Sequence, residues 1–467
     1  MALSCSDDLV PDMPRPAGLR VEVTARPEDL LQLALSYPER YPVFLDSAGA
    51  GPLANRHLLF RANGATLRRD AAGRIAGNHA REQLGFLDAL QAWYQEAGER
   101  GPTKDWLGGW VVYLGYECAA EVEPTLRLPP SVDPLSAYAA YCPVQLAADV
   151  GAQSVVISGE AGSQALLDAC IADLEAVARA GPESAVLTAR YVVQEDPPEQ
   201  FLDAVRRAQL HIAAGDIYQA NLSRGWRAAL PVPRGAAIHE LYPRLRQTNP
   251  GPFAALLQTE SFAVLSSSPE RLIQVSGRSV STRPIAGTRP RSRRADADAA
   301  EIAALVAHPK ERAEHIMLID LERNDLGRVC EGGSVEVDEF LTVESYRHVH
   351  HIVSSVRGRL RAGLTMIDAL RAVFPGGTIT GVPKIRCMQL IAQLEGQGRG
   401  AYTGSLGYLG LNGQCDFNIL IRTLVIGESE IRLRTGAGIV ADSDALRELE
   451  ETRAKARGLL AALAGPP

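Results

Sequence analysis

Apolar residues recur at helical spacing in two long stretches of the chain, and these stretches anchor the prediction. The stretches are His308–Val329 and Asp444–Leu463. Pro309 suits the first turn of a helix, where its missing N–H is no loss, and Gly327 is a suitable end. The first helix carries one stripe at helical spacing, formed by Ala313, Ile316, Met317 and Asp320.

Shorter patterns predict strands and helices along the rest of the chain. The predicted strands are Leu19–Thr24, Tyr41–Ala48, Trp106–Glu117, Ile217–Trp226, Phe262–Leu265, Leu272–Val275, Ser279–Arg283, Val335–Val337, His351–Arg359, Gly404–Leu411, Asn418–Ile426, Ile431–Arg434 and Ala437–Val440. The other predicted helices are Pro27–Ser36, Leu87–Ala97, Gln164–Arg179, one that begins at Pro198 and stops at Gly215, Leu364–Val373 and one that ends at Leu394. The Pro- and Gly-containing stretch 180–198 divides the chain into domains 1–190 and 191–467.

Composition narrows the class of protein. The chain has 467 residues and a net charge of −7, which argues against nucleic acid or an anionic membrane as the main partner. No run of about 18 apolar residues predicts a membrane span. The seven cysteines form no C-x-x-C pair, which indicates reduced thiols. The N-terminus lacks the pattern of a signal peptide. We therefore expect a cytoplasmic protein.

Two pairs of glutamates suggest a metal site. Glu311 and Glu314 lie three residues apart on the first helix, and Glu448 and Glu451 repeat this spacing on the last. Residues three apart share one face of a helix. Four clustered carboxylates repel one another unless a cation neutralises them, and Mg²⁺ prefers such oxygen ligands. For either helix taken alone, the alternative to a metal site is that its glutamates are exposed on a solvated surface.

Other residues could bind an anion or move a proton. The glycine-rich loop Gly376–Gly381 precedes a helix and offers backbone N–H groups to an anion, but Val382 stands where a P-loop requires lysine. Arg422 lies in an apolar predicted strand, where either a ligand carboxylate or a buried ion pair would satisfy it. Glu270 sits in a tight turn and could act as a general acid if its pKa were raised. The cluster of histidines at 348–351 lacks a third zinc-ligand pattern, so hydrogen bonding or proton handling fits it better.

These motifs together resemble one enzyme family. They are PIAGTRPR, HPKERAEHIMLIDLERNDLGRV, FPGGTITGVPK, IRTL, GAGIVADS and ELEETRAKA, in that order over residues 198–463. The pattern is similar to that of the chorismate-utilising enzymes, which include anthranilate synthase component I, aminodeoxychorismate synthase component I and isochorismate synthase. The resemblance, supported by strand-rich halves, implies a mixed α/β (α+β) fold. We expect two large, mostly antiparallel β-sheets packed face to face, with helices outside.

The resemblance also implies roles for individual residues. Mg²⁺ would be held by Glu314 and Glu451, with Glu311 and Glu448 behind them through water. Glu270 would protonate the departing 4-hydroxyl of chorismate, and His351 and Lys384 would complete the catalytic group. The implied substrate-binding residues are Gly287, Thr288, Thr380, Tyr402, Arg422, Gly436, Gly438 and Lys455. Ser47 would lie in an N-terminal pocket that holds an amino acid in anthranilate synthases.

Two positions bear on which nucleophile and product the resemblance implies. Gln219 stands where the water-adding members carry a lysine base, which leaves the amine-using members. Most motif details favour 4-amino-4-deoxychorismate as product, whereas Ala286 favours anthranilate because it replaces the lysine nucleophile of many aminodeoxychorismate synthases. No cysteine has a nucleophile-elbow context, so we expect ammonia from a separate glutamine amidotransferase partner. A regulatory module that binds ligand without catalysis is the alternative from another class.

Overall fold

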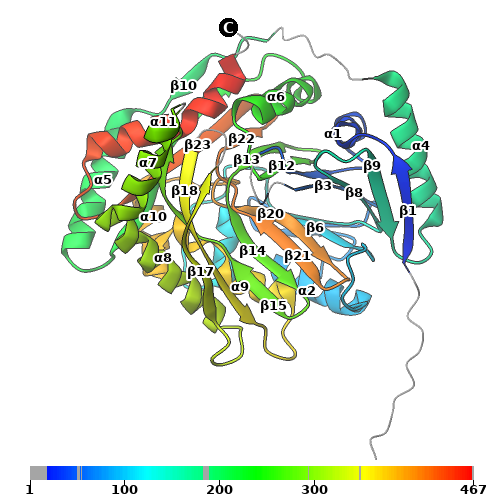
Figure 1. Cartoon of the computed structure of the whole chain (residues 1–467), viewed down its shortest axis with the longest axis horizontal. Helices are drawn as coiled ribbons and strands as arrows, with labels where there is room; N and C mark the ends of the chain where they lie inside the picture. The colour runs from blue at the N-terminus through cyan, green and yellow to red at the C-terminus, as the bar shows by residue number, and fades with distance from the viewer. Residues whose placement is uncertain are drawn as a thin grey trace, which may run out of the picture.

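The computed structural model describes residues 18–49, 53, 55–81, 83–181, 189–292, 294–345 and 349–464. Two large antiparallel sheets dominate it (Figure 1). The first sheet has the order β1 (Leu19–Thr24), β9 (Ser154–Gly159), β8 (Val144–Asp149), β3 (Arg56–Arg61), β2 (Val43–Asp46), β12 (Phe253–Gln258), β13 (Ala263–Ser268), β22 (Thr423–Ile426), β23 (Glu430–Ile439), β11 (Gln219–Ala229) and β10 (Val193–Glu195), with β19 (Gly381–Val382) also paired to β11.

The second sheet carries three of the predicted site residues, Gly287, Thr288 and His351. Its order is β16 (Ile285–Pro290), β18 (Val349–Arg359), β15 (Ser279–Thr282), β14 (Arg271–Ser276), β21 (Gln414–Asn418), β20 (Ser405–Gly410), β6 (Gly109–Leu114), β7 (Leu135–Tyr141), β4 (Thr66–Asp70) and β5 (Ile75–Gly77), with β17 (Glu336–Ser345) also paired to β18. Buried apolar side chains from both sheets, among them Phe60, Val264 and Val111, form one core between them. The expected face-to-face sheet packing is therefore confirmed.

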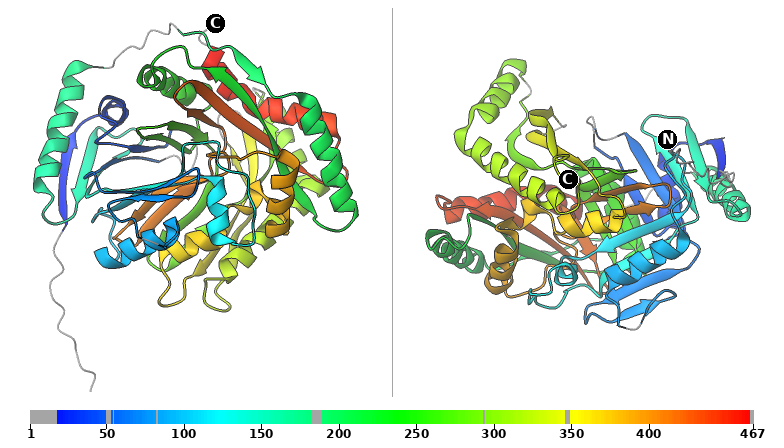
Figure 2. Two further views of the ribbon diagram at one scale, coloured as in Figure 1. Left: turned by 180° about the vertical axis from the view of Figure 1, so that it is seen from behind. Right: turned by 90° about the horizontal axis from the view of Figure 1, so that it is seen from below.

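Helices cover the outer faces of the sheets (Figures 1 and 2). On the first sheet lie α1 (Pro27–Ser36), α4 (Gln164–Ala180), α5 (Pro198–Ala213), α6 (Arg234–Thr248), α10 (Lys384–Glu395) and α11 (Ala445–Ala464). On the second lie α2 (Phe86–Ala97), α8 (Pro309–Gly327) and α9 (Met366–Val373), and α7 (Ala295–Ala307) packs beside α8. Short helices occur at η1 (Tyr116–Cys118), α3 (Ala119–Val122) and η2 (Gly377–Ile379). None of the helices in the described ranges is long and apolar enough to cross a membrane.

Both sheets combine strands from the two predicted domains. In the first sheet, β2 of the first half pairs with β12 of the second. In the second sheet, β6 pairs with β20 along Gly109–Leu114. The domain boundary at 190/191 stays a prediction. In the structure, strands from both sides of this boundary belong to the same two sheets.

The helix at Pro309–Gly327 is confirmed, but the structure differs from the sequence patterns in several details. The stripe of α8 that contains Ala313 and Asp320 faces solvent, and Ile316 is 48% exposed. The buried face carries Leu318, Ile319 and Leu326 together with the polar residues His315 and Glu322, so apolar spacing marks it only in part. The predicted strand Asn418–Ile426 is broken before Thr423, because Arg422 adopts a left-handed φ of 52°. The two predicted strands near the C-terminus form one strand, β23, and helices α6 and α7 were not predicted.

Candidate active site

One edge of β23 is open where the predicted site residues gather. β22 pairs with β23 only at Ile431–Leu433, whereas β11 pairs along its whole length. Lys455 Nζ donates a hydrogen bond to Gly436 O over 3.0 Å from the open side. Polar groups two residues apart on a strand point the same way, so those of Gly438 face this edge too. The backbone of both glycines is therefore available to a ligand, in the region expected from the sequence.

Glycine is required at both positions because side chains approach them closely. A Cβ on Gly436 would lie 2.6 Å from the Tyr402 hydroxyl. A Cβ on Gly438 would lie 2.5 Å from Gln219 Nε2. Real Cβ contacts are longer than 3.0 Å. The two glycines thus bring Tyr402 and Gln219 against the face of β23.

Helix α8 directs its glutamate pair toward this region. Gln219 Nε2 donates a hydrogen bond to Glu314 Oε1 over 3.0 Å, and that oxygen lies 3.6 Å from the Cβ position of Gly438. Glu311 Oε2 lies 2.9 Å from the Cβ position of Gly287, whose φ of 72° also favours glycine. The i, i+3 spacing therefore does place both carboxylates on the inner side of α8.

Helix α11 contributes the second glutamate pair from the opposite side. Glu451 accepts a salt bridge from Lys455 over 2.8 Å, and both side chains are about half exposed. Glu448, one turn earlier, is half-buried. Among the described residues, no three of His, Cys, Asp or Glu lie close enough to hold a metal ion. A Mg²⁺ ion at the open edge would therefore depend on one or two carboxylates together with substrate and water, a ligand set that this ion commonly uses.

Glu270 is a buried acid with a proton affinity suited to catalysis. It lies in the turn between β13 and β14 and is only 5% exposed. Burial raises the pKa of Glu270 to about 7, although the Thr378 hydroxyl donates a 2.8 Å hydrogen bond to its Oε1, which favours the ionised form. The surface-turn alternative is excluded for this residue. A carboxyl group with this pKa is partly protonated at neutral pH and can serve as a general acid.

Arg422 and His351 lie near this acid. The guanidinium of Arg422 interacts electrostatically with Glu270, yet it forms no ion pair within the described part of the chain, and burial lowers its pKa. His351 lies on β18 opposite Thr288, and the Gly287 backbone forms a hydrogen bond with it. Burial, aided by the Arg422 charge, lowers the pKa of His351 to about 3. The histidine is therefore neutral, and the unpaired arginine can accept an anionic ligand.

Two predicted site residues make contacts within the protein. Lys384 forms a buried ion pair with Asp325 of α8 and donates a hydrogen bond to Val373 O over 3.1 Å. The Thr380 hydroxyl is fully buried and donates to Gly376 O over 2.9 Å. These contacts fold the glycine-rich loop and fix the start of α10. A direct role of Lys384 or Thr380 toward a ligand stays a prediction.

The remaining predicted residues lie at the edges of this arrangement or far from it. The side chains of Thr288 and Ala286 fall outside the described part of the structure, as does His348. His350 binds Asp298 Oδ1 over 2.9 Å. Ser47 borders a separate cavity of about 700 Å³, which also contains Arg56 and Arg271. The Ser47 hydroxyl itself donates to Arg56 O over 2.6 Å.

Sequence reasoning missed two groups that shape this site. Thr378 lies in the glycine-rich loop that was noted, but only the fold brings it to Glu270. Asn221 follows Gln219 by two residues on β11, so it shares the face of Gln219. Alternation along the predicted strand could have indicated Asn221.

Comparisons with known proteins identify the family of this chain. A family model described as chorismate binding enzyme matches residues 52–461. The chain is 42% identical over 386 residues to anthranilate synthase component 1 of Streptomyces coelicolor, covering 76% of this chain and 73% of the relative. It is 46% identical over 263 residues to aminodeoxychorismate synthase component 1 of Bacillus subtilis, covering 56% and 55%.

A solved structure shows the same fold. The crystal structure of anthranilate synthase component I from Streptococcus pneumoniae superposes with a TM-score of 0.76 at 29% identity, covering 86% of this chain and 91% of that one. The fold and the family match together define the class. The chain belongs to the chorismate binding enzymes.

Proposed function

We propose that this chain catalyses the amination of chorismate by ammonia. Two neighbouring buried groups carry the proposal. Glu270 has a pKa of about 7, and Arg422 is a cation that has no ion-pair partner among the described residues. Chorismate is a dianion with a hydroxyl leaving group, so it needs both a cation and an acid. The neutral amide of Gln219, where other members carry a lysine base, supports ammonia over water as the nucleophile.

The chain's residues then have defined tasks. Arg422, Tyr402 and the backbone of Gly436 and Gly438 hold the enolpyruvyl side of the substrate. Ammonia adds at C2 and loses a proton, both ring double bonds shift, and the C4–O bond breaks. Glu270 gives its proton to the departing hydroxide, which leaves as water. Neutral His351 stays a hydrogen-bonding group beside the ring.

We propose Mg²⁺ as the cofactor at the open edge, because this ion can bind through one or two carboxylates together with a substrate anion and water. Glu314 and Glu451 would hold it, with Glu311 and Glu448 behind them. The bound ion would withdraw electrons from the ring carboxylate of chorismate. Gln219 and Lys455, which bind Glu314 and Glu451 in this structure, are in position to keep these carboxylates oriented.

For the product, we propose anthranilate and pyruvate as the first candidate. The relative from Streptomyces coelicolor, which covers 76% of this chain, is an anthranilate synthase component, and Ala286 excludes a lysyl nucleophile at that position. After amination at C2, loss of the C2 proton and cleavage of the C3–O bond would release pyruvate and form the aromatic ring.

A second candidate product is 4-amino-4-deoxychorismate, the precursor of 4-aminobenzoate in folate biosynthesis. It is favoured by the motifs GDIYQANLSR, FPGGTITGVPK and DFNILIRTL, and by the 46% identity to the Bacillus subtilis aminodeoxychorismate synthase component. Because Ala286 offers no amine, ammonia itself would act in place of the lysine. After the C4 hydroxyl leaves as water, a second ammonia would add at C4 and the first would leave from C2, so that the amino group ends at C4 and the enolpyruvyl group stays on the ring.

The ammonia would come from a glutamine amidotransferase partner. The six cysteines within the described ranges are all buried, and burial raises the pKa of Cys387 to about 12. A thiol in this state is a poor nucleophile. The purified chain should therefore use ammonium but not glutamine.

A product assay tests the proposal. Purified protein is incubated with chorismate, Mg²⁺ and ammonium, and the products are separated by mass spectrometry. Anthranilate with pyruvate supports the first candidate. An aminated product that keeps its enolpyruvyl group, and yields 4-aminobenzoate only after a lyase is added, supports the second. Isochorismate as the sole product would refute amination.

A further inference from the structure

Asn221 carries a buried hydrogen-bond donor that the protein does not use. Its side chain is 8% exposed, and Nδ2 has no hydrogen-bond partner within the described residues. A buried amide N–H without an acceptor is costly, so native proteins rarely keep one without a reason. A ligand that supplies an acceptor is one such reason.

The unused donor points at the open glycine pair. Nδ2 lies 3.2 Å from the Cβ position of Gly436, next to the Tyr402 hydroxyl, which lies 2.6 Å from the same point. The register pairs Asn221 with Gly438, and opposite residues in a sheet present their side chains on one face. The Tyr402 hydroxyl also has no hydrogen-bond partner in the described ranges. Leu222 O lies 2.6 Å from the same Cβ position, but no hydrogen bond within the described residues joins it to Asn221 Nδ2, which stays without an acceptor.

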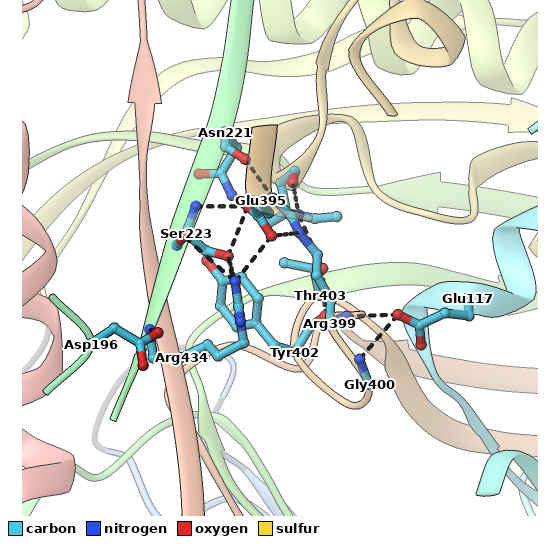
Figure 3. Close-up of polar contacts among 12 residues, drawn as sticks. Glu117, Asp196, Asn221, Ser223, Glu395, Arg399, Gly400, Tyr402, Thr403 and Arg434 are labelled. Carbon is cyan, nitrogen blue, oxygen red and sulfur yellow. Dashed lines mark hydrogen bonds and ion pairs between the residues drawn. The ribbon is translucent and has the colours of Figure 1, made fainter. Parts of the chain in front are cut away.

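Hydrogen bonds hold the backbone of Asn221 on both sides, and Figure 3 shows the one that joins it to Arg399. Its N–H donates to Thr380 O over 2.8 Å. Its carbonyl accepts a 2.6 Å hydrogen bond from Arg399, a fully buried arginine whose charge is balanced by Glu395. The same Arg399 donates to Ile379 O over 3.1 Å in the glycine-rich loop. Asn221 is therefore preorganised relative to that loop and to Tyr402.

We propose that Asn221 is a substrate-contacting residue whose amide N–H binds an oxygen of the enolpyruvyl side of chorismate. The inference rests on the proposed function, because that function supplies an oxygen-rich anion at the glycine pair. Asn221 and Tyr402 donate from one wall of the site, and the Gly436 backbone from another. The contact would hold the enolpyruvyl group of the substrate in place. Loss of this group gives one candidate product, and its retention gives the other.

Two substitutions of similar size test this assignment. Asn221→Leu removes the donor, and Asn221→Asp replaces it with a negatively charged acceptor. We expect KM for chorismate to rise about tenfold in Asn221→Leu, and further in Asn221→Asp because its charge repels the substrate. The change in kcat should be smaller, and the melting temperature of Asn221→Leu without chorismate should not fall, since the lost N–H had no partner.

Asn412 provides the matched control. It is also buried, but its Nδ2 already donates to Thr103 O and Asp105 O. Asn412→Leu should lower the melting temperature and leave KM for chorismate unchanged. This opposite pattern separates a structural asparagine from one that binds ligand.

Calorimetric titration of chorismate with Mg²⁺ distinguishes the possible failures. Wild-type protein that binds chorismate, with both Asn221 variants binding equally well, would overturn this inference and leave the proposed function intact. Retained binding in Asn221→Asp alone would show that the amide oxygen, not the N–H, faces the substrate, which also overturns it. Wild-type protein that does not bind chorismate would overturn both.

Discussion

The Thr378 hydroxyl donates a 2.8 Å hydrogen bond to Glu270 Oε1, which ties the glycine-rich loop to the buried acid. The two residues are more than a hundred positions apart in the sequence. The donated hydrogen bond favours the ionised carboxylate, whereas burial favours the neutral form. Burial prevails, and the pKa of Glu270 is raised to about 7.

This balance predicts how activity depends on pH. A general acid must be protonated, so the rate of chorismate amination should fall as pH rises through about 7. Thr378→Val removes the hydrogen bond that favours the charged form, so it should move this decline to higher pH. The measurement is kcat/KM against pH for wild type and Thr378→Val, with ammonia held constant as the free base. A decline that moves to lower pH would contradict the assignment.

Glu270→Gln should lower kcat at least a hundredfold, the usual scale of general acid catalysis. Because the pKa of Glu270 is raised, the stability that it contributes is greatest below pH 4.5 and is lost as pH rises toward 7. Glu270→Gln should therefore gain stability relative to wild type between pH 5 and 8. Urea unfolding of both proteins across that range measures the difference, and equal pH dependence would show that Glu270 is solvated.

The glutamates on α8 and α11 should govern the magnesium requirement. Glu314→Gln and Glu451→Gln should each raise the Mg²⁺ concentration for half-maximal activity at least tenfold, because each loses an anionic oxygen ligand. Glu450→Gln is the control, since Glu450 is exposed and pairs with Arg453 instead. Tryptophan fluorescence during Mg²⁺ titration gives a readout independent of turnover. If all three variants bind Mg²⁺ like wild type, the metal assignment fails.

The open edge of β23 should not tolerate a side chain. Gly438→Ala would force Gln219 away from its 3.0 Å contact with Glu314, so chorismate affinity should fall at least tenfold. An extra methyl group in a closely packed region lowers the free energy of unfolding by roughly 1–3 kcal/mol. The control is Gly427→Ala, where the nearest atom would lie at 3.5 Å and no positive φ is required. Equal chorismate binding in the two variants would exclude close approach of the ligand at Gly438.

Arg422 should matter more for binding than for folding. Removing a buried charge that lacks an ion-pair partner relieves a desolvation cost, so Arg422→Met should fold at least as stably as wild type. Its KM for chorismate should rise at least a hundredfold. Arg422→Lys should be intermediate, because lysine keeps the charge but not the planar pair of donors. A stability loss in Arg422→Met without a change in KM would identify Arg422 as a structural residue.

The sequence predicted the bounds of α8 because local signals set them. Pro309 and Gly327 begin and end this helix as predicted. Apolar spacing indicates only part of its buried face, since the polar residues Glu322 and Asp325 also turn inward, against Lys384, which lies far away in the sequence. Periodicity identifies buried faces only where burial and apolarity coincide.

The site shows the same limit. The spacing of Glu311 and Glu314 correctly indicated a shared face of α8. The local sequence around Glu270 did not predict that this residue is buried, because Thr378, which contacts it, comes from a loop far away in the sequence. Likewise, the unused donor of Asn221 becomes visible only when β11 pairs with β23. The residue types along the chain suggested which chemistry the site could perform. Which side chains are buried, and which groups they contact, depends on contacts between segments that lie far apart in the sequence.

The most direct test of the central claim follows the nitrogen atom. Purified chain is incubated with chorismate, Mg²⁺ and ¹⁵N-ammonium, without glutamine, and the product mass is measured. We expect one ¹⁵N atom in a product formed from chorismate, either as anthranilate or as an aminated ring that keeps its enolpyruvyl group. A product that has gained only oxygen from water, or chorismate left unchanged, would contradict this expectation.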